Sequence, residues 1–217
     1  MAKTALIAGS TGLVGGHLLK LLIESTEYNR VIALVRNPID AESDKLEVLQ
    51  VNFDDLENEL NGVQADDVFC CLGTTMKKAG SKEKFKKVDL KYPVDIGRQA
   101  LAYGASTYLL ISAIGADTGS SFFYNQVKGE VEEQVGRLGY NSVHIFRPSL
   151  LLGGREETRI GEKIAETFTK ALGFLFIGPL KKYKGIEASK VANAMFEMAQ
   201  HHSQGIRIYE SDDLQEF

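Results

Sequence analysis

Residues 4–19 read TALIAGSTGLVGGHLL, a short apolar run that leads into glycines at every third position. A helical pattern follows at once, because Leu18, Leu19, Leu22 and Ile23 are spaced for one buried face. This layout is typical of a strand, a phosphate-binding loop and a helix N-terminus, where free N–H groups and the helix dipole favour a diphosphate. The alternative interpretation is an ordinary strand-to-helix turn.

The rest of the chain repeats the alternation of strands and helices that this opening begins. Apolar runs predict seven strands, at Ala5–Ala8, Val31–Val35, Leu46–Val51, Val68–Leu72, Tyr108–Ala113, Val143–Phe146 and Ile206–Tyr209. Helical spacing lies between most of them, at Leu13–Ser25, Leu56–Leu60, Ser81–Tyr103, Phe122–Leu138, Ile160–Leu172 and Ala188–His201. Pro93 should kink or restart the third of these helices. The pattern predicts a doubly wound parallel α/β sheet, the Rossmann fold, with its ligand beyond the carboxyl ends of the strands.

Length and composition fit one domain. With 217 residues, we predict a single unit in which residues 1–150 form the coenzyme and catalytic part. Residues 151–217 would form a small substrate lid and the last strand, with the stretch Gly173–Gly185 as a loop over the site. No apolar stretch is long enough to span a bilayer, and no metal site is expected.

Net charge and cysteine usage indicate the kind of partner and the cellular compartment to expect. A net charge of −4 gives no reason to expect nucleic acid as a partner. The two cysteines, Cys70 and Cys71, are adjacent and would point to opposite faces of a strand, so they cannot form a useful disulfide. Reduced cysteines suit a reducing compartment, and we therefore expect a cytoplasmic protein.

The end of the second strand indicates which coenzyme is bound. Sheets that prefer NAD usually carry an acidic residue there, whereas an arginine suits the 2′-phosphate of NADP. Here the strand ends in Arg36-Asn37-Pro38, and the first acid, Asp40, lies beyond the proline. We therefore predict NADPH over NADH, with a solvated surface arginine as the alternative.

Further coenzyme contacts are predicted at the ends of other strands. Asn52 and Phe53 could bracket the adenine, although a polar loop residue after a strand explains Asn52 equally well. Gly73 would permit close approach, and Thr74 could bond to a ribose or phosphate. The predicted coenzyme set around the glycine loop and these strands is Gly9, Ser10, Thr11, Gly12, Leu13, Val14, Arg36, Asn52, Phe53, Leu72, Gly73 and Thr74.

A serine, a tyrosine and a lysine form the candidate catalytic set. Ser112 ends the fifth strand, and Tyr124 and Lys128 stand four apart, so they share a helix face. A phenol is a weak acid with an ordinary pKa of about 10, and a nearby ammonium favours its ionised form. Tyr124 would be the proton donor in carbonyl reduction, Lys128 would assist it and hold the nicotinamide ribose, and Ser112 would hydrogen-bond the substrate oxygen. The alternative is an amphipathic helix with an incidental pair.

Residues 76–91 are rich in lysine. A solvated helix face is the simpler interpretation, and a docking surface for an acidic partner is the other.

With these features in place, the chain resembles an atypical short-chain dehydrogenase/reductase of the extended type, and more narrowly the Tat-interacting oxidoreductase family of NADPH-binding proteins. The stretches that carry the resemblance are Gly9–Gly15, Cys70-Cys71-Leu72-Gly73-Thr74-Thr75, Lys78-Ala79-Gly80, Tyr124–Glu132 and Phe146-Arg147-Pro148. The resemblance implies a Rossmann fold, NADPH binding, a Ser-Tyr-Lys site, Arg36 on the 2′-phosphate and Pro148 near the nicotinamide. Asp89 stands where the family's asparagine is usual, and Ser149 where its glycine is.

Two hypotheses about function remain open. The first is an NADPH-dependent reductase of a small aldehyde or ketone, or an enzyme that catalyses the reverse oxidation of the alcohol. The second is a regulatory or protein-interaction module that senses NADP(H) without turnover. A homodimer through the helices at Ser81–Tyr103 and Phe122–Leu138 is expected from fold analogy alone.

Overall fold

Seven parallel strands form the centre of the computed structural model, which describes residues 2–153, 184–201 and 203–217. The strands are β1 (Lys3–Ala8), β2 (Tyr28–Val35), β3 (Leu46–Gln50), β4 (Asp67–Cys70), β5 (Thr107–Ile111), β6 (Ser142–Arg147) and β9 (Gly205–Glu210). Their order is β3-β2-β1-β4-β5-β6-β9, and every neighbouring pair is parallel. All seven predicted strands are present, and the doubly wound Rossmann fold is confirmed.

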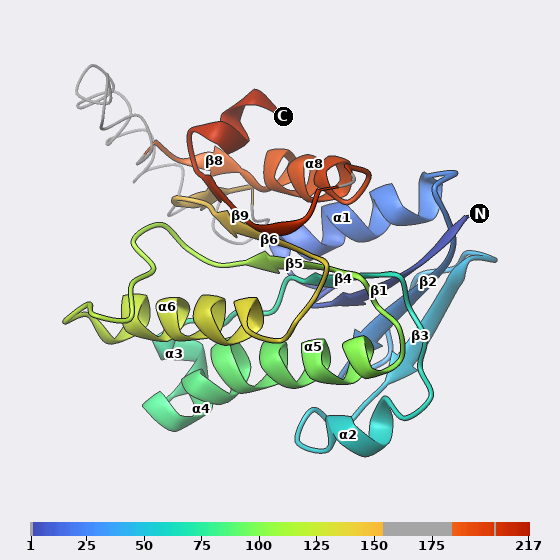
Figure 1. Ribbon diagram of the computed structural model, residues 1–217, viewed down its shortest axis with the longest axis horizontal. Helices are drawn as coiled ribbons and strands as arrows, with labels where there is room; N and C mark the ends of the chain where they lie inside the picture. Colours follow the sequence, from blue (N-terminus) through green and yellow to red (C-terminus); the bar gives the residue numbers. More distant parts are fainter. Residues whose placement is uncertain (1, 154–183, 202) are drawn as a thin grey trace.

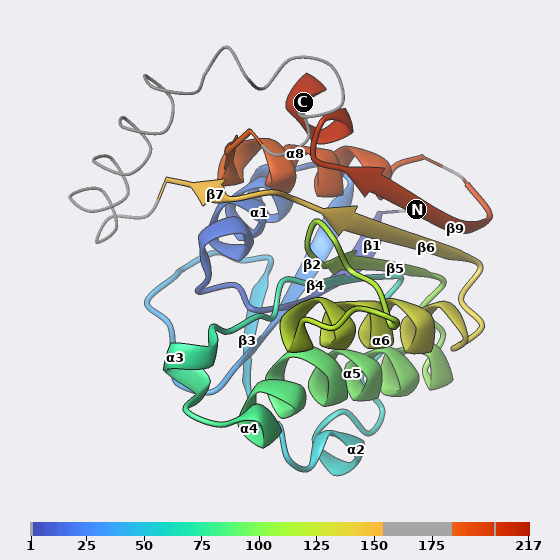
Figure 2. The ribbon, with the colours of Figure 1, turned by 90° about the vertical axis from the view of Figure 1, so that its left-hand side faces the viewer.

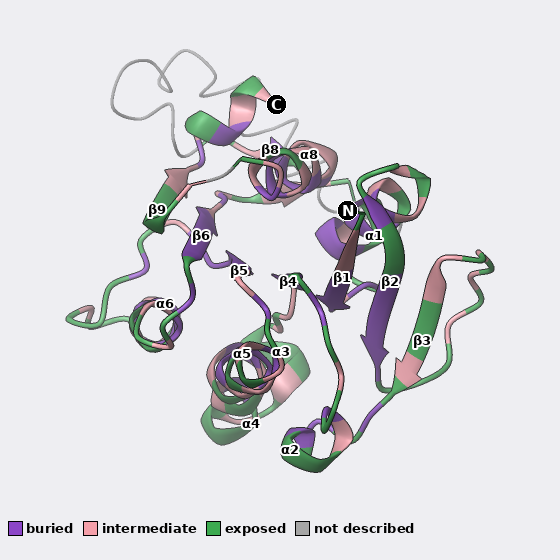
Figure 3. Ribbon diagram, turned by 45° about the vertical axis from the view of Figure 1, so that its right-hand side comes forward, coloured by how far each residue is buried: buried purple, intermediate pink, exposed green. Residues whose placement is uncertain are grey.

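Helices cover both faces of this sheet, which gives three layers (Figures 1 and 2). α1 (Leu13–Glu24) and α8 (Ala188–Met198) pack on one face. The other face carries α2 (Leu56–Glu59), α5 (Tyr92–Ala102) and α6 (Phe123–Gly136). Because both faces of the central strands are covered, the apolar runs Ala5–Ala8 of β1 and Val31–Val35 of β2 are buried, whereas the edge strand β3 is partly exposed (Figure 3).

The strand order reverses between β1 and β4, and this reversal places the loops that matter for function. The register pairs Ala8 of β1 with Leu34 of β2 and with Cys70 of β4. The three strands therefore end at the same level, and the loops that follow them meet at one edge of the sheet. In doubly wound sheets this is the point where a ligand binds.

The segment predicted as one helix from 81 to 103 is helical but has three parts. α4 (Lys82–Lys86) leads into a π-helical turn, η1 (Lys87–Lys91), and α5 follows from Tyr92 with Pro93 in its first turn. The backbone stays helical at Lys87, Lys91 and Tyr92, so the structure shows a change of helix type just before Pro93 where a kink or restart was predicted. A short helix, α3 (Met76–Ala79), precedes this segment.

The late part of the chain was less predictable. A two-stranded pair, β7 (Leu151–Leu152) with β8 (Ile186–Glu187), and a terminal 3-10 helix, η4 (Asp213–Glu216), have no clear periodicity in the sequence. The predicted helix at 160–172 and nearly all of the predicted loop at 173–185 lie outside the described residues. The division at residue 150 stays a prediction. Within the described residues, no helix has the length and apolar character that a bilayer span requires.

Candidate coenzyme cleft and catalytic residues

A cleft of about 480 Å³ opens where the loops after β1, β2 and β4 meet. Its walls are completed by side chains from α3, η1 and α5. Eight residues of the predicted coenzyme set line it: Gly9, Thr11, Gly12, Arg36, Phe53, Leu72, Gly73 and Thr74. The cleft thus gathers residues that are far apart in the sequence, at the place that the strand order predicts.

The other predicted coenzyme contacts do not line the cleft. Val14 is buried in the core, and Leu13 packs against that core. Asn52 lies in the loop after β3, where its Oδ1 accepts from the Asp54 N–H at 3.1 Å. That bond fits the interpretation of Asn52 as a turn residue. Ser10 is 4 % exposed, and its Oγ lacks a hydrogen-bond partner among the described residues.

The glycine loop has the shape of a diphosphate cradle. Gly9 has φ +87°, and a Cβ there would stand 2.5 Å from the Cys71 carbonyl oxygen. A Cβ on Gly15 would stand 2.1 Å from the Gly9 carbonyl oxygen, so only glycine lets α1 approach β1 this closely. Gly12 is the N-cap residue of α1, and no side chain caps the N–H groups of the first turn. The first turn also contains no acidic residue. Together with the orphaned Ser10 hydroxyl, these features fit the phosphates of a dinucleotide.

Two cations line the cleft, and one of them escaped the sequence analysis. Arg36 follows β2 as predicted, and Lys78 of α3 joins it in the lining. No carboxylate occurs among the described residues of this lining. Lys78 belongs to a stretch that carries the family resemblance, but it was not predicted as a coenzyme contact, because it is one of several lysines in residues 76–91 and only the fold places it at the cleft.

The predicted catalytic residues lie outside the lining of this cleft. Tyr124 is 40 % exposed in the first turn of α6, and its ring packs against Phe85 of α4, with ring centres 5.7 Å apart. The Lys128 ammonium lies 6.0 Å from the centre of the Tyr124 ring. The shared helix face that the spacing predicted therefore exists.

Asp89 connects this pair to the cleft. Its Oδ1 lies 2.7 Å from Lys128 Nζ, and its Oδ2 accepts from the Thr74 N–H at 2.9 Å. Burial disfavours the Lys128 ammonium, but the Asp89 carboxylate, together with Tyr124 and Cys70, more than offsets burial and raises the pKa of Lys128 above its ordinary value. Lys128 is therefore charged at neutral pH.

Ser112 is held by a second buried carboxylate. Its Oγ donates to Glu132 Oε1, and its N–H donates to the Phe146 carbonyl at 2.7 Å. Arg147 binds both oxygens of Glu132, at 3.0 and 2.6 Å, and these bonds raise the pKa of Arg147. Glu132 follows Lys128 by four residues on α6, so the same periodicity that predicted Tyr124 and Lys128 could have pointed to it.

Pro148 is buried after β6, and its carbonyl accepts from the Ile114 N–H at 3.1 Å. This bond joins the loop that follows Ser112 to the loop after β6. The position of Pro148 near a nicotinamide stays a prediction.

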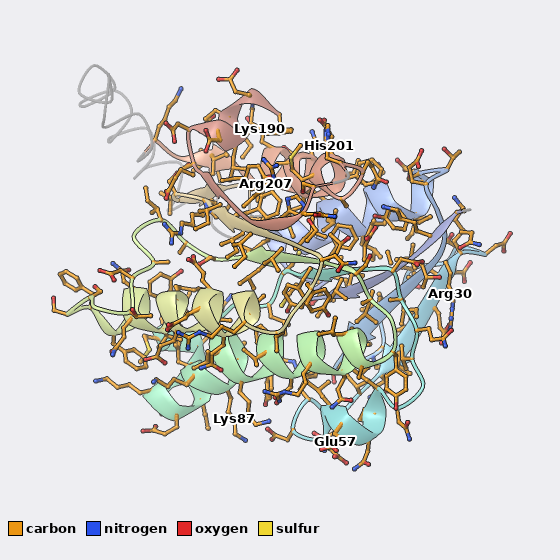
Figure 4. The ribbon with its side chains drawn as sticks, in the orientation of Figure 1. Arg30, Glu57, Lys87, Lys190, His201 and Arg207 are labelled. Carbon is orange, nitrogen blue, oxygen red and sulfur yellow. The ribbon has the colours of Figure 1, made fainter. Side chains whose placement is uncertain are left out.

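Three of the seven lysines in residues 76–91 form ion pairs with neighbouring carboxylates. Lys86 pairs with Glu130 at 2.9 Å, Lys87 with Asp54 at 2.8 Å, and Lys91 with Asp95. Lys87 projects from the outside of the helical layer (Figure 4). These surface pairs favour the interpretation as a solvated face, and docking of an acidic partner stays a prediction.

Comparison with known proteins gives consistent matches. A family model described as NAD(P)H-binding matches residues 9–138. Protein HTATIP2 of Rattus norvegicus is 37 % identical over 174 residues, which cover 78 % of this chain and 72 % of that protein. Protein FMP52, mitochondrial, of Candida albicans is 34 % identical over 222 residues, which cover 96 % and 95 %.

Solved structures agree on the fold. The Bordetella bronchiseptica enzyme WbmH, solved in complex with NAD+, superposes with a TM-score of 0.73 at 12 % identity and covers 97 % of this chain and 76 % of its own. The PhqB reductase domain from Penicillium fellutanum gives a TM-score of 0.69 at 14 % identity, with 99 % and 69 % covered.

One expectation is contradicted by these relatives. Several FMP52 proteins are named mitochondrial, and these names contradict the expected purely cytoplasmic location. Both cysteines are free, as expected, but free cysteines do not tell one reducing compartment from another.

Proposed function

Because the chain belongs to the NAD(P)H-binding family, we propose that it is an NADPH-dependent oxidoreductase that reduces a small carbonyl compound or oxidises the corresponding alcohol. The observation that carries the proposal is the cleft at the strand reversal, where the glycine loop and two cations meet. Its oxidoreductase-like fold is shared with solved enzymes.

The charges of the cleft support a preference for the phosphorylated coenzyme. Arg36 and Lys78 would hold the 2′-phosphate or the diphosphate. The described residues of the lining include no carboxylate that would repel these phosphates. Gly9, Thr11 and Gly12 would hold the diphosphate at the start of α1. Phe53 would pack against the adenine from the end of β3.

The catalytic roles follow from acidity and charge. When bound, the coenzyme supplies the hydride that reduces the carbonyl carbon. Tyr124 gives its phenolic proton to the carbonyl oxygen, which yields the alcohol, and recovers a proton from solvent through its exposed side chain. Lys128 stabilises the phenolate that remains. Ser112 is proposed to hydrogen-bond the substrate oxygen, once its present bond to Glu132 is rearranged.

The same geometry supports one alternative, a module that binds NADP(H) without turnover. Ser112, Tyr124 and Lys128 do not line the cleft, and two of them are bound by carboxylates. Such a module would bind NADPH tightly and change its affinity for a protein partner.

One pair of measurements separates the two functions. NADPH binding would be measured by fluorescence titration of wild type and of Tyr124→Phe, and oxidation of NADPH would be followed with a panel of aldehydes and ketones. The enzyme hypothesis expects equal binding and at least a hundred-fold loss of turnover in Tyr124→Phe. Binding without turnover by wild type supports the sensing module, and no NADPH binding contradicts both.

A further inference from the structure

Asp89 is a buried carboxylate between the coenzyme cleft and the proposed proton donor. It is 1 % exposed, and it lies in the π-helical turn η1 between α4 and α5. A Cβ on Gly73 would stand 3.6 Å from Asp89 Oδ1, so the carboxylate lies directly behind the cleft wall. Turns of this type occur mostly as single insertions in helices, frequently at functional sites.

Each oxygen of Asp89 binds a different wall of the site. Oδ2 accepts from the backbone N–H of Thr74, in the loop after β4 that lines the cleft. Oδ1 lies 2.7 Å from Lys128 Nζ on α6. One side chain therefore fixes both the coenzyme loop and the ammonium that faces Tyr124.

The charges around Lys128 leave Asp89 as its counter-ion. The groups that act on the ammonium are Asp89 from η1, Tyr124 from its own helix and Cys70 from β4. Burial raises the pKa of the Cys70 thiol, so that group is neutral. The charged pair nearest in sequence, Lys86 with Glu130, is closed on itself at 2.9 Å. A formal charge of +1 on Lys128 is thus balanced by −1 on Asp89.

We propose that Asp89 is a positioning residue that keeps the buried Lys128 protonated beside Tyr124, while anchoring the coenzyme loop through Thr74. This inference rests on the proposed function of Tyr124 and Lys128. An amide at position 89 would keep a hydrogen-bond acceptor for Lys128 but would remove the negative charge that offsets its burial. Lys128 would then lose its proton more easily, and the site would favour the phenolate of Tyr124 less.

The test measures phenolate formation directly and needs no substrate. Wild type and Asp89→Asn are titrated by absorbance at the tyrosinate band, and the matching Tyr124→Phe background is subtracted from each. Burial raises the pKa values of five other tyrosines, which moves their ionisation above that of an ordinary phenol: Tyr28, Tyr92, Tyr108, Tyr140 and Tyr209. We expect the midpoint of the Tyr124 transition to rise in Asp89→Asn by about half a pH unit or more, because the phenolate loses a charged neighbour.

Two further variants keep the inference falsifiable. Asp95→Asn removes a carboxylate that pairs with Lys91 and Arg98 on the outer side of α5, and should leave the midpoint unchanged. Should Asp89→Asn not fold, the double change Asp89→Asn with Lys128→Met removes both charges, a replacement that buried pairs often tolerate. Its midpoint should also lie above that of wild type, because no ammonium then lies beside Tyr124.

The outcomes separate this inference from the proposed function. An unchanged or lowered midpoint in Asp89→Asn overturns the role of Asp89, even where NADPH binds and is oxidised. A double variant whose midpoint equals that of wild type also overturns it, because Lys128 would then have no effect on the phenol. A wild type that does not bind NADPH refutes the proposed function, whatever the titration gives.

Discussion

At the residue scale, the positive charge of the cleft rests on Arg36 and Lys78. Lys78→Met should weaken NADPH binding by about ten-fold or more, because a hydrogen bond between charged groups contributes about 1.5–3 kcal/mol. Arg36→Met should weaken NADPH binding at least as much, and NADH binding less. Fluorescence titration with both coenzymes measures these differences.

The neighbouring lysine is a matched control for this prediction. Lys77 lies on the same short helix α3 and is exposed, but it does not line the cleft. Lys77→Met should therefore bind NADPH like wild type. Equal losses of NADPH affinity in both lysine variants would show that Lys78 acts only through the net charge of the molecule. A loss for Lys78→Met that is the same with NADPH and NADH would place its contact at the diphosphate.

A second residue, His144, makes stability depend on pH. It lies fully buried in β6, with Ser142 Oγ at 2.9 Å from Nε2 and the Tyr209 hydroxyl at 2.9 Å from Nδ1. Burial, helped by Arg207, lowers its pKa to about 4. The unfolded chain takes up this proton near pH 6.5, whereas the folded protein does not until about pH 4. Stability from this residue is therefore complete above pH 6.5 and is lost as the pH falls toward 4.

We expect wild type to lose about 2 kcal/mol more unfolding free energy than His144→Gln between pH 7.5 and pH 5.0. Urea unfolding of both proteins at the two pH values measures the difference. The exposed His17 provides the control, since His17→Gln should follow wild type. A parallel loss in wild type and His144→Gln would show that other groups govern the acid sensitivity.

At the element scale, α1 carries two adjacent glycines with opposite expected responses. A Cβ on Gly15 would stand 2.1 Å from a backbone oxygen, whereas one on the exposed Gly16 would meet its nearest atom, the Ser10 carbonyl oxygen, at 3.7 Å. Gly15→Ala should destabilise the protein by about 2–4 kcal/mol and impair NADPH binding, because α1 must move away from the loop. Gly16→Ala should stabilise it by up to about 1 kcal/mol through helix propensity.

Thermal unfolding with and without NADPH distinguishes the two alanine variants. Similar stabilities for both would show that the loop adapts at Gly15, and that close packing of α1 on β1 is not required there.

Periodicity predicted the regular elements well, because strands buried on both faces and helices with one buried face leave strong patterns. It could not predict η1, since a π turn adds one residue without changing which side chains are apolar. The contact between Asp89 and Lys128 was not predicted for a different reason. The two residues are 39 positions apart, and only packing of η1 against α6 brings them together. The pair β7 and β8 is too short for any period to register.

At the scale of the whole molecule, the resemblance stated from motifs is confirmed by the family match and by the HTATIP2 and FMP52 relatives. The position of the coenzyme cleft was predictable, because strand order and the glycine loop fix it together. Contacts that depend on side-chain geometry were not, as Lys78 and the Glu132 bond to Ser112 illustrate. The free cysteines did not determine the cellular location, and the names of the relatives contradict the expected cytoplasmic location.

The cleft joins loops from both halves of the sheet, and this arrangement predicts how the coenzyme stabilises the molecule. NADPH at a hundred times its Kd should add about 2.7 kcal/mol to the unfolding free energy, or about 5–10 °C in Tm for a chain of this size. Hydrogen exchange should slow in the loops at 9–12, 36–39 and 71–75, which line the cleft from β1, β2 and β4. The turn before β9, at the opposite edge of the sheet, should exchange as it does without coenzyme. Protection spread evenly over both edges would mean that NADPH binds elsewhere, because a ligand at the strand reversal touches only the carboxyl ends of the strands.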